Sequence, residues 1–282
     1  MVAMQKFHHN TMLLLCNSDC ILMPMHILQT LILGAVEGLT EFLPISSTAH
    51  MIMASRLMHL ANTDFLKTFE IVIQFGAILA IVVLYWKRLY SLRYVWSRIL
   101  AAFIPTGIIG LVLYKFFKDS LIGNTSVAIW ALGIGGALLI LFEIFHKDKM
   151  PTPDSIAELA SMSHLKAAAI GLAQALAIIP GVSRSAATIV AGRALGVSRA
   201  AIVEFSFLLA VPTILAASGY ELLKSTPHLD AGQYGYLLIG LATAFITAHF
   251  SVRWLLKYIQ THNFTSFGIY RIIIAFAFIP FL

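Results

Sequence analysis

Charged residues are scarce in this sequence. Only 11% of its 282 residues are charged, whereas soluble domains carry about 25%. A water-soluble chain could not cover its surface with so few charges, so the composition excludes an ordinary soluble protein. Hydrophobic residues make up 59%, and the mean hydropathy is +0.87. At about 20 residues per spanning helix, the chain has room for roughly eight membrane-embedded segments and no separate soluble domain.

Cysteine is almost absent as well. Cys16 and Cys20 both lie near the N-terminus, so no disulfide supports the apolar bulk of the chain, and their spacing alone is a weak metal signal. The apolar run at 12–16 is too short for a secretory signal, and no small-residue cleavage site follows it. We therefore interpret residues 1–22 as an N-terminal extension, disordered or upstream of the true start. Residues 23–282 then form a single transmembrane domain.

Acidic residues are outnumbered by basic ones, which gives a net charge of +6. The basic residues lie mainly in short loops beside apolar runs, which indicates membrane topology and lipid headgroups as partners, not nucleic acid. The strongest such loop is predicted at 85–98, with four basic residues and no acidic one. The positive-inside rule places it in the cytoplasm. The loop at 147–149 falls on the same side, and the loop at 115–119 faces outward.

Ten apolar segments follow one another along the chain. They cover residues 26–43, 47–60, 69–86, 99–114, 127–145, 167–179, 186–195, 205–222, 234–256 and 267–282. The segments at 47–60 and 186–195 are too short to cross a bilayer easily. We expect them to be re-entrant or broken helices, which are tolerated only where protein or a water-filled cavity covers the freed backbone. The predicted fold is therefore an all-α, polytopic membrane bundle.

An internal repeat is visible at a constant offset of 136 residues. It pairs Pro44 with Pro180, Ser47 with Ser183, and the Ile-Leu-Ala at 78–80 with the same tripeptide at 214–216. Repeats that place a binding site at their interface, built from broken helices, are a known membrane architecture. The repeat halves cover about 26–145 and 164–282. Since an odd number of crossings separates them, we expect them to be inverted.

The first polar cluster is EGLTEFLPISSTAH, from Glu37 to His50. Glu37 and Glu41 are four residues apart, so a helix places both carboxylates on one face, where they repel each other. In an apolar segment they also carry a desolvation cost. A helix end that reaches into the headgroups would be the simpler explanation. Two acids, two serines and a histidine within so few residues favour a functional site instead.

A second helix begins inside this cluster, after Pro44. Ser46, Ser47 and Thr48 can cap it, and its free N–H groups favour a bound anion. His50 lies three residues after Ser47, so its ring can reach the Ser47 hydroxyl. A hydroxyl near a histidine and a carboxylate is the general arrangement of an activated nucleophile.

The second polar cluster is PGVSRSAAT, from Pro180 to Thr188. Arg184 stands between two apolar segments, where an arginine is costly unless it meets an anion. Its guanidinium suits bidentate phosphate binding, although an arginine in a turn at a membrane surface is the simpler alternative. Gly181 permits close backbone approach. Hydroxyl donors for phosphate are added by Ser183, Ser185 and Thr188. The two helix starts could face each other.

Three further polar residues interrupt apolar segments. Gln74 needs a hydrogen-bond partner and could line the site. Glu204 could be a second carboxylate or a charge near a helix start. Arg271 could contact phosphate or extend toward the headgroups.

Both long motifs resemble those of the undecaprenyl-diphosphate phosphatase family, the bacitracin-resistance type. The stretches EFSFLLAVP at 204–212 and IYR at 269–271 resemble it too, and the likeness runs from about Met23 to the C-terminus. The resemblance implies about six transmembrane helices plus two re-entrant elements in inverted repeats, in the bacterial inner membrane, with a site that faces the periplasm. It implies hydrolysis of undecaprenyl diphosphate to the monophosphate and inorganic phosphate, which recycles the carrier for peptidoglycan synthesis and gives bacitracin resistance. The catalytic residues carried over by position are Glu37, Glu41, Ser47, His50 and Arg184.

Several chemical alternatives stay open at this point. The nucleophile is Ser47, His50 or a water. A divalent cation, Mg²⁺ or Ca²⁺, on Glu37 and Glu41 would relieve their repulsion and bridge to phosphate. A polyprenyl-phosphate transporter that uses the same site is the main rival, since broken helices are also typical of transporters. A cation channel is a second rival, and the oligomeric state is open between a monomer and a homodimer.

Overall fold

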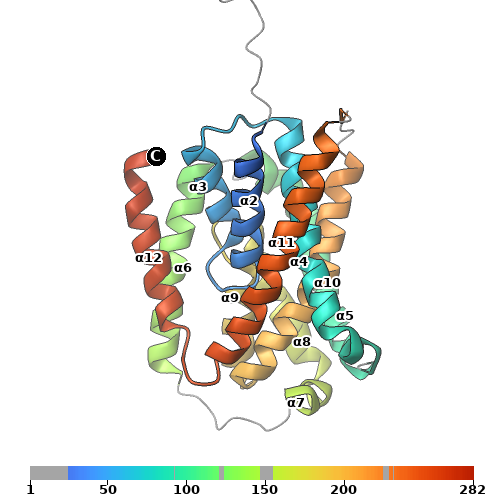
Figure 1. Ribbon diagram of the computed structural model, residues 1–282. Coiled ribbons are helices and arrows are strands. Elements are labelled where there is room, and N and C mark those ends of the chain that lie inside the picture. Colours follow the sequence, from blue (N-terminus) through green and yellow to red (C-terminus); the bar gives the residue numbers. More distant parts are fainter. Residues whose placement is uncertain (1–24, 92, 121–123, 147–154, 225–228, 231) are drawn as a thin grey trace, which may run out of the picture.

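The computed structural model describes residues 25–91, 93–120, 124–146, 155–224, 229–230 and 232–282, and these residues form helices and no strands (Figure 1). In chain order the elements are α2 (Ile27–Thr40), α3 (Ser47–Leu57), α4 (Asp64–Ser91), α5 (Arg93–Ser120), α6 (Thr125–Phe145), α7 (Ser155–Ser161), α8 (His164–Gln174), the 3₁₀ turn η1 (Ala175–Ile178), α9 (Arg184–Ala194), α10 (Arg199–Lys224), α11 (Gln233–Tyr258), α12 (Thr265–Phe278) and η2 (Ile279–Phe281).

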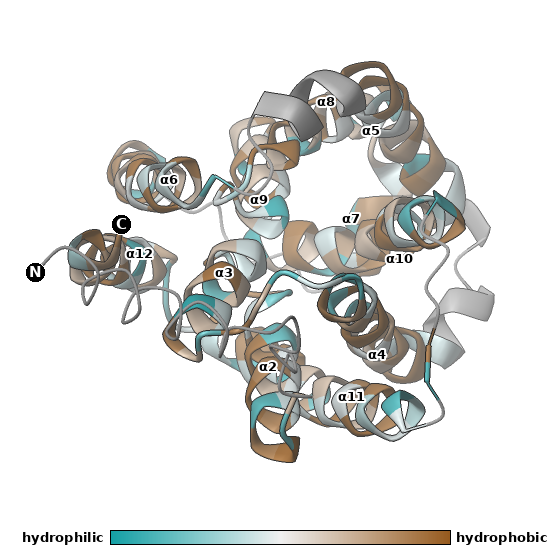
Figure 2. Cartoon of the chain, turned by 90° about the horizontal axis from the view of Figure 1, so that it is seen from above, coloured by the Kyte–Doolittle hydropathy of each residue, from teal (hydrophilic) through white to brown (hydrophobic). Residues whose placement is uncertain are grey.

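Five of these helices are long and apolar enough to cross a membrane: α4, α5, α6, α10 and α11. Their outer faces present large apolar side chains, such as Val112, which is 72% exposed. Figure 2 shows hydrophobic residues on the outer sides of the bundle. Because such surfaces are stable in lipid and not in water, the protein is a multi-pass, all-α membrane protein, as predicted. The last predicted span corresponds to the shorter apolar stretch Thr265–Phe281.

The two short helices predicted to be re-entrant are α3 and α9. Each has 11 residues and follows a break: α2 ends at Thr40 before α3 begins, and η1 ends at Ile178 before α9 begins. In Figure 1, α2 and α3 occupy the upper half of the molecule, whereas α7 and α8 lie toward its lower end. The two breaks therefore approach each other from opposite ends of the bundle.

The packing of the helices follows an inverted repeat. The first helix of the first half, α2, packs against α11, and the first helix of the second half, α8, packs against α5. Helices α5 and α11 hold the same place in their halves. The first helix of each half thus packs against the other half, and this exchange brings the two breaks together.

The register of the repeat differs from the sequence prediction at the helix starts. The N-cap of α3 is Ser46 and that of α9 is Ser183, 137 residues later. The constant offset of 136 is therefore wrong here by one residue, and Arg184 corresponds to Ser47. From the proline to the cap, the second break is one residue longer, Pro180 to Ser183 against Pro44 to Ser46. This stretch contains Gly181, which adopts φ +92° at a position where a Cβ would overlap the Ala128 carbonyl.

Two other expectations change. The predicted loop at 85–98 is almost wholly helical, because α4 continues to Ser91 and α5 resumes at Arg93. The short helix α7 was not predicted. Residues 1–22 and the basic loop at 147–149 lie outside the described residues.

Candidate active site

The two helix breaks are tied together by hydrogen bonds to backbone carbonyls. The Ser185 hydroxyl donates to the carbonyl of Leu43 at 2.7 Å, and the Ser183 hydroxyl lies 3.4 Å from the same oxygen. Leu43 belongs to the first break, and both serines belong to the second. The sequence predicted that the helix starts could face each other, and the structure brings them into contact.

Arg271 on α12 strengthens this junction. Its guanidinium is 1% exposed and donates to the carbonyls of Pro44 and Gly181, each at 3.2 Å, one from each break. Its other contacts are the carbonyls of Leu132 and Ala131 on α6. Arg271 was predicted to contact phosphate. The structure gives it four carbonyl partners, so it joins both breaks to α6, and its contact with phosphate stays a prediction.

Glu41 lies where the two helix starts meet. The Ser47 hydroxyl donates a short hydrogen bond to Oε2 of Glu41, and Nε of Arg184 lies 3.5 Å from Oε1. Ser47 and Arg184 are the first residues of α3 and α9. Equivalent positions of the two repeats therefore converge on one carboxylate, and both Glu41 and Arg184 are only 10% exposed.

Arg184 is held in this place by α10. Its Nη1 donates to the Ser206 carbonyl at 2.8 Å, while Thr188 donates to the Ser206 hydroxyl at 2.7 Å. Among the described residues, Nη2 of Arg184 has no hydrogen-bond partner, although it is buried. An unused guanidinium donor beside two helix N-termini suits a phosphate oxygen. Ser206 was not predicted; a lone serine within an apolar span was the available signal.

Glu37 lies one turn before Glu41 on α2, as the spacing predicted. It is 2% exposed and close enough to Glu41 and Arg184 to interact with both charges. Its Oε1 accepts no hydrogen bond from any described residue. Two adjacent carboxylates, one with an unused buried oxygen, fit the donor set of a hard divalent cation. Across the described residues, no group of three or more His, Cys, Asp or Glu side chains adds further ligands.

His50 does not contact Ser47. Its Nδ1 lies 2.8 Å from the Ser46 carbonyl, one helical turn back, and its Nε2 lies 2.9 Å from the hydroxyl of Tyr270. The two rings also stack, with centroids 5.6 Å apart and planes 4° from parallel. The predicted His50–Ser47 contact is therefore replaced by Glu41–Ser47. Tyr270 was missed as a candidate, although it stands inside the IYR stretch.

The remaining candidates make other contacts. Gln74 on α4 accepts a hydrogen bond from Ser218 on α10 at 2.7 Å, and Thr48 is exposed. Glu204 lines a separate cavity of about 370 Å³ with Tyr85.

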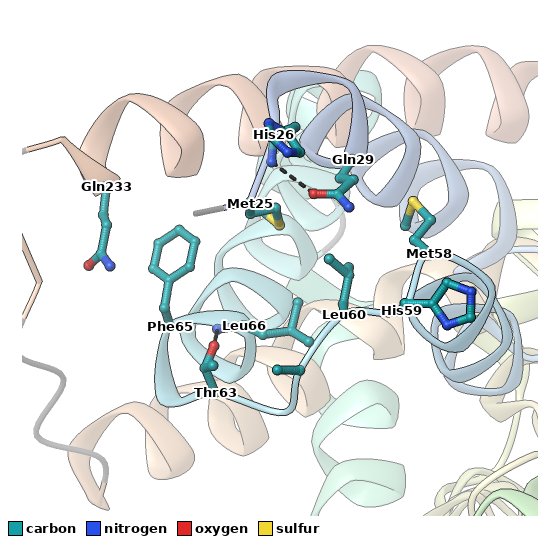
Figure 3. Close-up of a pocket in the computed structure, with 11 residues that line it drawn as sticks. Met25, His26, Gln29, Met58, His59, Leu60, Thr63, Phe65, Leu66 and Gln233 are labelled. Carbon is teal, nitrogen blue, oxygen red and sulfur yellow. Dashed lines mark hydrogen bonds between the residues drawn. The ribbon is translucent and has the colours of Figure 1, made fainter. Parts of the chain in front are cut away.

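A larger cavity of about 530 Å³ lies apart from the breaks (Figure 3). It is bordered by His26, which precedes α2, by Gln29 of α2, by Met58–Leu60 after α3, and by the start of α4. None of the predicted site residues lines it. The candidate chemistry is therefore in the closely packed junction of the breaks.

A family model described as bacitracin resistance protein BacA matches residues 30–277, which include the whole junction. The chain belongs to this family. Curated relatives named undecaprenyl-diphosphatase are similar along most of their length. The Aquifex aeolicus protein is 47% identical over 253 residues, covering 90% of this chain and 97% of its own. The Wolinella succinogenes protein is 47% identical over 258 residues, covering 92% and 99%. The Sulfurihydrogenibium protein is 48% identical over 247 residues, covering 88% and 96%.

Membership of the BacA family confirms the resemblance found in the sequence motifs. The names of these relatives describe a hydrolase and do not favour the transporter.

Proposed function

We propose that the protein removes the terminal phosphate of undecaprenyl diphosphate, releasing undecaprenyl phosphate and inorganic phosphate. The names of its relatives support the substrate. The observation that carries the chemistry is the Ser47–Glu41–Arg184 contact: a hydroxyl, a carboxylate that accepts its hydrogen bond, and a cation with an unused donor. This reaction recycles the carrier lipid for peptidoglycan synthesis, and its family name connects it with bacitracin resistance.

In the first step, Ser47 attacks the terminal phosphorus. Glu41 takes the hydroxyl proton while the Oγ–P bond forms and the bond to the bridging oxygen breaks. The bridging oxygen leaves with the lipid monophosphate and takes this proton from Glu41, which returns to its carboxylate form. A water then attacks the phosphoserine, Glu41 takes a proton from this water, and it gives this proton to the Ser47 oxygen as the Oγ–P bond breaks and inorganic phosphate departs.

Arg184 serves the same reaction by binding the terminal phosphate. When the phosphate oxygens reach Nε and Nη2, Arg184 no longer has to compensate the charge of Glu41, which becomes a stronger base. The guanidinium then offsets the negative charge that grows on the phosphoryl oxygens in the transition state. The free N–H groups at the starts of α3 and α9 add further positive charge beside these oxygens.

Glu37 and Glu41 would hold a divalent cation, Mg²⁺ or Ca²⁺. When bound, such an ion supplies charge neutralisation at the diphosphate. Glu37 would contribute its unused oxygen, and Glu41 would keep Oε2 for Ser47. Chelator should abolish turnover, and added Mg²⁺ or Ca²⁺ should restore it; full activity in chelator would remove the cation from this proposal.

The site faces the outside of the bacterial cytoplasmic membrane in this proposal. The basic residues at 85–98 support a cytoplasmic position for the α4–α5 connection. The start of α2 then lies at the outer face. A single cysteine placed at exposed His59, in a variant lacking Cys16 and Cys20, should react with a membrane-impermeant maleimide from outside the cell. Protection from this reagent in intact cells, with reaction after lysis, would reverse the orientation. A homodimer stays a prediction.

The decisive test is phosphate release by purified protein in detergent, across lipid diphosphates from farnesyl to undecaprenyl. Phosphate release needs no membrane partition, whereas transport does. A phosphoserine at Ser47, trapped by acid quench and mapped by mass spectrometry, is the expected intermediate. Active enzyme without this intermediate would exclude Ser47 as the covalent nucleophile and leave His50 or a water as the attacking group.

A further inference from the structure

Tyr270 and His50 form a hydrogen-bonded chain that ends at the residue before Ser47. The Ser46 carbonyl can only accept, so Nδ1 of His50 must carry a hydrogen and donate it at 2.8 Å. In the neutral ring Nε2 is then an acceptor, and the Tyr270 hydroxyl, 2.9 Å away, donates to it. The chain therefore runs from Tyr270 through His50 to Ser46.

Ser46 is the strained residue at this end. Its φ is +69°, a left-handed conformation that non-glycine residues rarely adopt and that costs of order 1–3 kcal/mol. Its carbonyl receives both the His50 ring hydrogen and the His50 backbone N–H, the latter at 3.3 Å. Its hydroxyl caps α3 by accepting from Ala49 N–H. These contacts fix the peptide that leads into Ser47, whose hydroxyl must point at Glu41.

We propose that Tyr270 is a positioning residue of this site: through His50 it holds Ser46 in its left-handed conformation and thereby aims Ser47 at Glu41. The inference rests on the proposed function for its kinetic readout. His50 then serves as a rigid link between α12 and the start of α3, because both of its ring nitrogens are in use and neither contacts Ser47. The stacked tyrosine ring, 39% exposed, fixes the plane of the imidazole.

The first test is a double-mutant cycle on phosphate release. Tyr270→Phe keeps the stacked ring and loses the donated hydrogen bond, so kcat should fall roughly tenfold with KM unchanged. In a His50→Ala background the same change should cost less than about twofold, since the link is already broken. Tyr258→Phe is the control, because its hydroxyl also donates one hydrogen bond, to Ser266 at 2.9 Å, outside the site. It should stay within about twofold of the parent.

The second test removes the strain itself. Glycine adopts φ +69° without penalty, so in a Ser46→Gly background Tyr270→Phe should cost clearly less than it does with Ser46. A tyrosine that touched the substrate directly would behave differently. Loss of its hydroxyl would raise KM, and the losses of activity in Tyr270→Phe and His50→Ala would multiply in the double mutant. Tyr270→Phe would also lower the activity as much with Gly as with Ser at position 46. That pattern would overturn the proposal.

A third readout is independent of activity. Nitrogen NMR of ¹⁵N-histidine-labelled protein, with the His50 signals assigned by their loss in His50→Gln, should show hydrogen on Nδ1 and an accepting Nε2. Tyr270→Phe should shift the Nε2 signal. An unchanged signal, or hydrogen on Nε2 in the neutral ring, would refute the chain of contacts. If the wild-type protein released no phosphate from any lipid diphosphate, the proposed function would fail, and this spectrum would still decide the contact.

Discussion

The starts of α3 and α9 share one backbone plan and differ in chemistry. Each is an 11-residue helix behind a break, and each is capped by a serine hydroxyl, from Ser46 or Ser183. The next residue is Ser47 in one and Arg184 in the other, and both reach Glu41. In the proposed mechanism, one copy of this repeated element supplies the attacking group and the other supplies the group that binds the phosphate. The fold supplies two helix N-termini, each with a partial positive charge, and the first side chain of each helix determines its proposed role.

The two starts also differ in how their backbone is strained. In the first, the left-handed residue is the cap itself, Ser46. In the second it is Gly181, two residues before the cap, where glycine carries no such cost. The strain therefore lies beside the proposed nucleophile and is absent beside the arginine. Such strain is typical of functional sites where the surrounding structure holds the backbone in place.

The largest effect is expected at the first helix start. Ser47→Ala removes the proposed nucleophile and should lower kcat for phosphate release by at least about 10³-fold. Ser251→Ala is a matched control, because this buried serine on α11 donates to the Leu39 carbonyl at 2.9 Å, a hydrogen bond that involves neither Glu41 nor Arg184. It should retain at least half the activity. Ser47→Ala turnover within tenfold of wild type would assign the attack to water or to another residue.

At the second helix start, activity should depend on the shape of the Arg184 side chain as well as on its charge. Arg184→Lys keeps the positive charge and loses the planar guanidinium that reaches Glu41 and Ser206 together, so we expect kcat/KM to fall roughly 30-fold. Arg199→Lys is the control, since Arg199 pairs with Glu143 at 3.1 Å and lies over Phe264. It should lower the melting temperature and leave kcat near normal. Equal kinetic losses in both variants would indicate a purely structural arginine.

In the second break, replacement of Gly181 should lower the stability of the fold. Gly181→Ala forces a Cβ into a positive-φ position and against the Ala128 carbonyl, which should destabilise the fold by about 2 kcal/mol. Gly219→Ala on α10 is the control, since an added Cβ there meets nothing within 4 Å. It should leave the melting temperature unchanged or slightly higher. Tryptophan fluorescence on heating in detergent measures both; an unaffected Gly181→Ala protein would show that the break can relax.

The sequence predicts where the long helices lie because apolar runs mark their membrane-embedded parts, but it does not predict how far α4 and α5 continue beyond these runs. The predicted segment at 127–145 is nearly α6, and the two short segments became α3 and α9. The carboxylates Glu37 and Glu41 were placed correctly on one helix face, since that depends on local geometry alone.

Tertiary partners could not be predicted in the same way. His50 can reach several atoms from its helix, and the choice of Ser46 and Tyr270 depends on how α12 packs. Arg271 finds carbonyls that are free only because both helices break beside it. The start of α9 is shifted by one residue relative to that of α3, in a break that contains a left-handed glycine, and a constant offset does not detect this local shift.

The smallest effect is expected for the serines that cap α3 and α9. Replacing each of them compares the two helix starts most directly. Ser183→Ala removes the hydroxyl that accepts from Ala186 N–H, so the melting temperature should fall by an amount equivalent to about 1 kcal/mol. Its kcat should change less than threefold, because Arg184 keeps its contacts with Glu41 and Ser206. Ser46→Ala removes the equivalent cap beside the proposed nucleophile, where the strained backbone also sets the direction of Ser47. We expect a similar loss of stability and a larger loss of kcat, and equal kinetic effects in the two variants would mean that the strain at Ser46 does not serve the reaction.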